Sequence, residues 1–197
     1  METINIIIGV AGLIIAIGLG LIPYFRKVYF VGPELTIELF PDGGYNIDKG
    51  QSGKNDRSKG YIDEEHEIHV FEITWLINLK ITNNSNITAY YPEIKFHSQQ
   101  LSFSHLDKLD KNKPIKGDEQ IILKGKYSMF EECESKNRTQ ATRLPENLKD
   151  LKILLEYKNP NKKKFYTIFT NSGLKGNNKY TRRPKELKDY KLLFFHQ

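Results

Sequence analysis

Hydrophobic and polar positions follow two different patterns, which divide the chain into an N-terminal helix and a region of strands. The first pattern is an uncharged apolar run from Ile6 to Ile22, which ends at Pro23 and is followed by Arg26 and Lys27. A helix rises about 1.5 Å per residue, so about 20 residues cross the hydrocarbon core of a bilayer. The run therefore predicts a transmembrane anchor over residues 1–27. Its acidic start and the absence of an Ala-x-Ala site favour an uncleaved anchor over a signal peptide.

The second pattern is an alternation of period two between Phe71 and Ile81. All odd positions are apolar, and the even positions are mostly polar. This alternation predicts a β-strand with one buried face. The turn residues Asn83–Asn86 then predict a returning strand over Thr88–His97, in which Pro92 favours an edge or a bulge.

Shorter segments predict further strands over Glu34–Phe40, Glu119–Tyr127, Leu151–Tyr157, Phe165–Phe169 and Tyr190–Phe195. The residues Asn159–Asn161 predict a hairpin. Pro145 opens a short helical turn within Leu144–Lys149. No long amphipathic helix is predicted after the anchor, which argues against a parallel βαβ sheet.

We therefore expect a mainly β domain over residues 28–197. Its predicted fold is an antiparallel immunoglobulin-like β-sandwich, and a small β-barrel is the alternative. Weakly patterned segments near residues 43–66 and 105–118 are predicted to be mobile loops. The Glu34–Phe40 strand is expected to stop at Pro41–Gly44.

The net charge of +6 is unevenly distributed along the chain. Residues 149–197 contain thirteen Lys or Arg against four Asp or Glu, whereas residues 28–148 contain fifteen against nineteen. This asymmetry predicts a basic surface that includes Lys162, Lys163, Lys164, Arg182 and Arg183. Anionic membrane lipid is the first candidate ligand for it, and a nucleotide or nucleic acid is the second. Neighbouring aromatic residues fit stacking with bases, and a solvated rim without any ligand is the alternative.

The anchor itself carries small residues on one helical face, namely Gly9, Gly12, Ala16 and Gly20. Small residues at this spacing let two membrane helices approach closely, so the stripe predicts homo-oligomerisation. Because Arg26 and Lys27 follow the apolar run, we expect a single-pass protein of the cell inner membrane with a cytoplasmic C-terminal domain.

The chain contains no motif that predicts catalysis. Neither Gly53-Lys54 nor Gly125-Lys126 completes a P-loop, and there is no G-x-S-x-G elbow. Cys133 lies among Glu131, Glu132 and Glu134, which raise the pKa of a thiol, so we expect it to be unreactive. The segment Asp63–His69 is rich in acidic residues, but its two histidines diverge on a strand. We therefore predict no enzyme activity, no metal site and no cofactor.

Three stretches carry a resemblance: Pro33–Glu38, Leu79–Ser85 with Thr88–Tyr90, and Leu154–Tyr157 before the lysine-rich hairpin. In these the chain resembles bacterial single-pass membrane proteins with an immunoglobulin-like β-sandwich. More distantly, it resembles β-rich membrane effectors of antiphage systems, which respond to nucleotides and typically carry more than one membrane helix. From the predicted anchor and the absence of catalytic motifs, we expect a membrane-tethered, non-enzymatic binding or adaptor domain that scaffolds a partner complex. The second resemblance implies a nucleotide-responsive, oligomerising membrane effector of a bacterial defence system.

Overall fold

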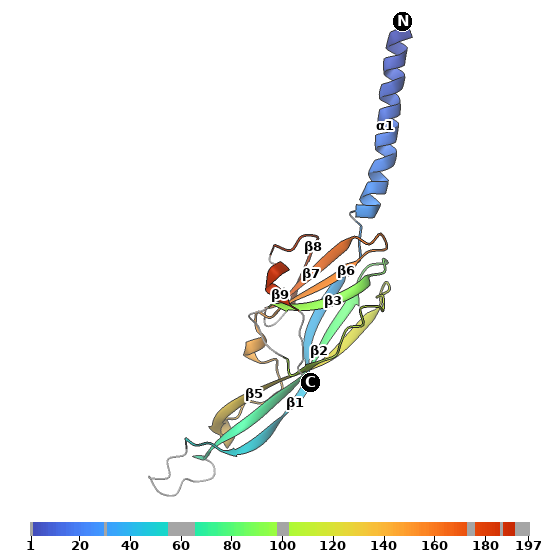
Figure 1. Cartoon of the computed structure of the whole chain (residues 1–197). Coiled ribbons are helices and arrows are strands. Elements are labelled where there is room, and N and C mark those ends of the chain that lie inside the picture. Colours follow the sequence, from blue (N-terminus) through green and yellow to red (C-terminus); the bar gives the residue numbers. More distant parts are fainter. Residues whose placement is uncertain are drawn as a thin grey trace.

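One long helix precedes all the strands. A computed structural model describes residues 2–29, 31–54, 66–97, 103–172, 176–185 and 187–191, with helix side chains described over residues 11–25. Helix α1 (Glu2–Tyr29) stands away from the β domain as a rod (Figure 1). The predicted helix is therefore confirmed. In the described part of the chain, no helix is long and apolar enough to cross a membrane, so the transmembrane character of α1 stays a prediction.

The strands form two antiparallel sheets, which confirms the mainly β prediction. The long sheet has the order β1-β2-β5-β4, and the short sheet has the order β8-β7-β6-β3-β9. The strands span β1 (Leu35–Gln51), β2 (Ile68–Asn83), β3 (Tyr90–His97), β4 (His105–Leu106), β5 (Gln120–Glu134), β6 (Lys152–Lys158), β7 (Lys164–Asn171), β8 (Gly176–Thr181) and β9 (Tyr190–Lys191). Short 3₁₀ turns occur at Ser135–Asn137, Glu146–Leu148 and Leu187–Asp189. Over the described residues the sheets do not close into a barrel, so the barrel alternative is wrong.

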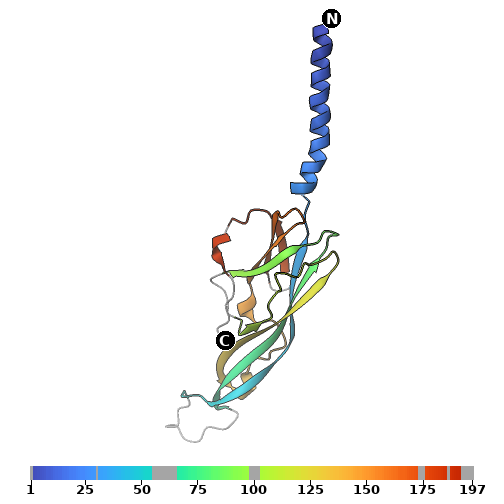
Figure 2. The same cartoon turned by 45° about the vertical axis from the view of Figure 1, so that its right-hand side comes forward.

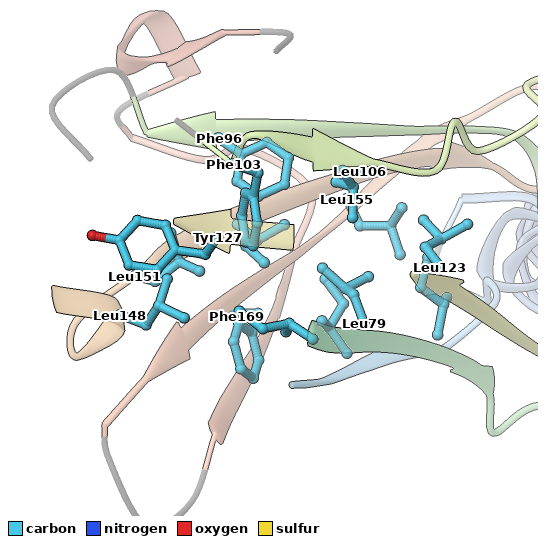
Figure 3. Close-up of a cluster of buried hydrophobic side chains, with 14 of the residues drawn as sticks. Leu79, Phe96, Phe103, Leu106, Leu123, Tyr127, Leu148, Leu151, Leu155 and Phe169 are labelled. Carbon is cyan, nitrogen blue, oxygen red and sulfur yellow. The ribbon is translucent and has the colours of Figure 1, made fainter. Parts of the chain in front are cut away.

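The apolar faces of the two sheets meet in one main core. All six odd positions from Phe71 to Ile81 in β2 are at most 2% exposed, as the alternation predicted. Figure 3 shows how residues from both sheets share this core, with Leu79 and Leu123 of the long sheet near Leu155 and Phe169 of the short sheet. Burying such side chains contributes about 1.5–3 kcal/mol each.

The strand after the Asn83–Asn86 turn does not pair with β2. Strand β3 crosses to the short sheet, where it pairs with β6 and β9, while β2 pairs with β1 and β5. The bulge expected at Pro92 is confirmed, because the β3–β6 register shifts between Tyr90 and Glu93 and Tyr91 has a φ of 53°. Alternation specifies which face of a strand is buried but not which strand lies beside it.

The predicted end of the first strand is also wrong. Strand β1 continues through Pro41–Gly44 by a register shift and runs on to Gln51, so residues 43–51 are strand instead of loop. Gly43 takes a φ of 92° at this shift, a conformation that glycine adopts readily. Residues 55–65 of the predicted loop lie outside the described residues.

Two other predicted segments can be compared directly. The second predicted loop contains β4 and then irregular chain, in which Ile115 is fully buried and pairs with Ala89. The predicted helical turn is present as the 3₁₀ turn after Pro145. Of the strand expected over Tyr190–Phe195, the first two residues form β9 at an edge, and the rest lie outside the described residues.

Candidate functional site

The basic residues that were predicted to form a surface lie together at one end of the short sheet. The strand registers pair Tyr90 with Lys158, Lys158 with Lys164, and Tyr166 with Thr181. The start of β3, the end of β6, the start of β7 and the end of β8 therefore share one end of the sheet. We call this the basic end; its basic residues are Lys158, Lys162, Lys163, Lys164, Arg182 and Arg183.

The basic end is also where the chain arrives from α1. The Nδ2 atom of Asn159 donates to the carbonyl oxygen of Val31 at 3.3 Å. A Cβ atom added at Gly32 would clash with the ring of Phe165, so the backbone passes directly over this ring. Figure 2 shows that α1 leaves the domain at this end, opposite the far ends of β1, β2 and β5.

The β6–β7 hairpin presents the lysines through a tight turn. Asn159 organises it: its Oδ1 accepts from the backbone N–H of Lys163 at 2.9 Å, and its carbonyl accepts from that of Lys162 at 2.9 Å. Lys162 has a φ of 59°, in the left-handed region. Asn159 is buried, whereas residues 160–164 are exposed. The buried amide thus supports a turn whose lysines face outward.

Lys164 takes part in an ion-pair network. Its Nζ lies 2.6 Å from Glu156, which also pairs with Lys95 at 2.7 Å. Lys95 in turn pairs with Glu93 at 3.1 Å. Burial raises the pKa of Glu156, but the ammonium groups of Lys164 and Lys95 outweigh it and hold the pKa below its ordinary value. The positive charge of Lys164 is therefore largely compensated by Glu156 within the domain.

A pocket of about 580 Å³ lies beside the basic end. Its lining includes Val31, Gly32, Tyr157, Phe165, Tyr180 and Arg182. The rings of Tyr157 and Phe165 are stacked 6.3 Å apart, and the guanidinium carbon of Arg182 lies 4.7 Å from the Phe165 ring centre. Burial raises the pKa of Tyr157 to about 12. Because Tyr157 and Phe165 are buried, a flat or anionic group could contact the half-exposed ring of Tyr180 and the guanidinium of Arg182.

Lys158 and Gly32 belong to this end but were missed by sequence reasoning. The Nζ atom of Lys158 lies 5.3 Å from the ring centre of Tyr91, which is half exposed. Its position directly before the turn residues Asn159-Pro160 was the available signal. Tyr190 lies away from the basic end, by His97 at the far end of β3, with the two ring centres 5.4 Å apart.

The small-residue stripe is present on α1. Gly12, Ala16 and Gly20 are exposed, and a Cβ atom at Gly12 or Gly20 would meet nothing within 4 Å. Gly9 lies outside the part of α1 whose side chains are described. The monomer therefore has room for larger side chains along this face.

No other cluster gathers catalytic chemistry in the described residues. Burial and the carboxylate of Glu131 raise the pKa of Cys133, as the sequence predicted. Nδ1 of His69 lies 2.8 Å from Asp48, and its Nε2 lies 3.4 Å from Glu67. Among the described side chains, no group of three or more potential ligands could hold a metal ion.

Comparison with known proteins identifies no relative from which a function could be carried over. No protein-family model matches the chain, and no curated protein is significantly similar to it. The resemblance to bacterial membrane-anchored β-sandwich proteins therefore stays a prediction.

Proposed function

We propose that this protein is a membrane-tethered, non-enzymatic binding or adaptor domain that scaffolds a partner complex. In this proposal α1 is a single-pass anchor in the cell inner membrane, and the two-sheet domain lies on its cytoplasmic side. The observation that carries the proposal is the surface of α1, taken together with the basic end where α1 leaves the domain.

The described part of α1 is apolar around its whole circumference. Its large side chains are 46–65% exposed from Leu13 to Phe25, and none of them belongs to either described core cluster. A helix that is apolar on all sides needs a nonpolar environment, which lipid provides. The sequence extends this surface back to Ile6 and adds Arg26 and Lys27 at its end, as expected of an anchor with its C-terminal side in the cytoplasm.

A surface for a protein partner is available at the far end of the long sheet. There the ends of β1, β2 and β5 continue away from α1 (Figure 1). The register aligns Ile47, Glu72 and Phe130 in one row on the outer face, with Phe130 66% exposed and Ile47 42% exposed. Exposed apolar residues gathered on one face are typical of protein contacts. This arrangement supports an adaptor function.

The alternative is a nucleotide-responsive, oligomerising membrane effector of a bacterial defence system. The aromatic pocket favours it, because the half-exposed ring of Tyr180 could stack on a base and the Arg182 guanidinium could pair with a phosphate. The pocket also includes Val31 and Gly32, which directly follow α1, so a ligand there would touch the connection to the anchor. Nucleotide-dependent oligomerisation of the full chain in detergent would support this alternative over the first proposal.

Membrane attachment and sidedness test the proposal. We expect the full chain, with a compartment-sensitive reporter fused after Gln197, to resist carbonate extraction and to report a cytoplasmic C-terminus. The variant Leu13→Arg with Ile17→Arg should move it to the soluble or aggregated fraction, since each arginine costs about 2.5–3.5 kcal/mol at a helix centre. Leu13→Ile with Ile17→Leu is the matched control. Full extraction of the wild-type chain, or an external reporter, would refute the proposal as stated.

A further inference from the structure

We infer that the basic end of the short sheet docks on the anionic headgroups of the same bilayer that α1 enters. This inference rests on the proposed membrane anchor and adds a lipid class and an orientation to it. Docking at this end would orient the domain so that the far ends of β1, β2 and β5 are directed away from the membrane.

The basic end lies directly beside the point where α1 ends. Only residue 30 stands between the end of α1 and Val31, and Val31 is already hydrogen-bonded to Asn159 in the β6–β7 turn. Gly32 then passes over Phe165 without room for a side chain. The hairpin that carries Lys162 and Lys163 is therefore held within a few residues of the point where the anchor ends.

The charge at this end of the short sheet also supports docking. Lys162, Lys163 and Arg183 are exposed. The nearest described acidic groups are Glu93 and Glu156, which form ion pairs with Lys95, Lys111 and Lys164, and Glu34 at the pocket. The corresponding end of the long sheet is different: it combines Asp118 and Glu119 with Lys113 and Lys116. Among the described residues, the basic end of the short sheet therefore carries an excess of positive charge.

Exposed tyrosines lie beside these basic side chains. Tyr91 and Tyr180 at the basic end are 48% and 45% exposed, and Tyr90 is 36% exposed. Tyrosine is enriched where protein meets the headgroup layer, because its ring is apolar and its hydroxyl is polar. Lysine and arginine near an anionic leaflet each contribute about 1 kcal/mol, equivalent to about a fivefold change in binding. This mixture fits a bilayer surface better than a polar partner protein.

The experiment places a fluorophore at the basic end of the full chain in nanodiscs. Asn161→Cys in a Cys133→Ser background is labelled, and quenching by headgroup spin-labelled lipid is measured in phosphatidylcholine discs with and without phosphatidylglycerol. Gln140→Cys, exposed in the segment after β5, is the distant control label. We expect quenching at position 161 to rise when the anionic lipid is present and to fall again at high salt, with no such change at position 140.

Charge variants separate docking from general attraction. Lys162→Gln, Lys163→Gln and Arg183→Gln together should lower the ratio of docked to undocked domain by about 100-fold. The control Arg138→Gln, Arg143→Gln and Lys149→Gln removes the same charge from exposed positions between β5 and β6 and should leave quenching unchanged.

Four results would overturn the inference. Equal quenching at position 161 in both lipid mixtures, while the chain is inserted in both, would refute docking and leave the proposed anchor intact. Equal loss of quenching in the two charge variants would show that docking depends on the net charge of the domain and not on the charges of the basic end. Release by a single-stranded oligonucleotide beyond that of sodium chloride at equal ionic strength would assign the basic end to nucleic acid. A chain that enters neither disc would refute the anchor as well.

Discussion

Asn178 forms the hydrogen bonds with an edge strand that a neighbouring strand would usually form. Strand β1 is at the edge of the long sheet, so alternate backbone groups along it have no neighbouring strand. The Oδ1 atom of Asn178 accepts from the N–H of Ile37, and its Nδ2 donates to the carbonyl of the same residue, both at 2.9 Å. Thr167 adds a bond from its hydroxyl to the carbonyl of Leu35 at 2.7 Å. Side chains of the short sheet thus form hydrogen bonds with backbone groups of β1 that have no neighbouring strand.

We predict that Asn178→Ala destabilises the domain by about 1–3 kcal/mol, because it leaves two backbone groups of Ile37 without their partner. Urea unfolding of the variant and the wild-type protein measures this difference. The adjacent Asn177→Ala is the matched control, since Asn177 is exposed and should change stability by less than about 0.5 kcal/mol. Equal unfolding midpoints for the two variants would show that the contact between the sheets does not contribute.

At the scale of elements, alternation predicted the strands that bury one face and failed elsewhere. Strand β2 was recognisable because its apolar residues recur at every second position. Strand β8 (Gly176–Thr181) was missed, because it lies at an edge and its residues Asn177–Lys179 offer no apolar pattern. The continuation of β1 past Pro41 depends on a register shift, and such a shift is a property of the paired strand rather than of the local sequence.

Helix α1 yields a prediction of its own. Gly12→Ile with Gly20→Ile should reduce chemical cross-linking between full-length chains in detergent, because the larger side chains prevent close approach of two helices. Membrane insertion should persist, since both changes are apolar and the monomer has space at both positions. Ile14→Leu with Leu21→Ile, on the opposite face of the helix, should cross-link as the wild type does. Identical cross-linking in the glycine variant would remove the stripe as an association surface.

At the scale of the whole molecule, the described core belongs entirely to the two sheets and the segments between them. Both clusters of buried side chains draw their members from residues 35–190. The described residues of α1 contribute to neither cluster. Anchor and domain are therefore separate in their packing, although they are joined closely through Val31 and Gly32.

We predict that a chain of residues 31–197 folds without the helix. Its free energy of unfolding by urea in mild detergent should match that of the full chain within about 0.5 kcal/mol, because no described core contact is lost. Circular dichroism should show one cooperative transition in both chains. Absence of a cooperative transition in the shorter chain would mean that α1 stabilises the fold through contacts other than the described ones.

The candidate site could be predicted in its parts but not in its assembly. Lysine-rich and arginine-rich segments were visible in the sequence, and each lies next to an aromatic residue. That Lys162 and Arg182 share one end of a sheet depends on the β6–β7–β8 register. That the same end receives α1 depends on the packing of Gly32 against Phe165, which no local pattern encodes.

The contacts of Val31 and Gly32 have a consequence for how two copies of the protein would meet. Because Val31 bonds to Asn159 and Gly32 packs on Phe165, the point where the chain enters the domain is fixed on the surface of the domain. If two anchors associate through their small residues, the two basic ends are brought close together. Each domain is then present at a high effective concentration for the other, so weak contacts between the domains would form.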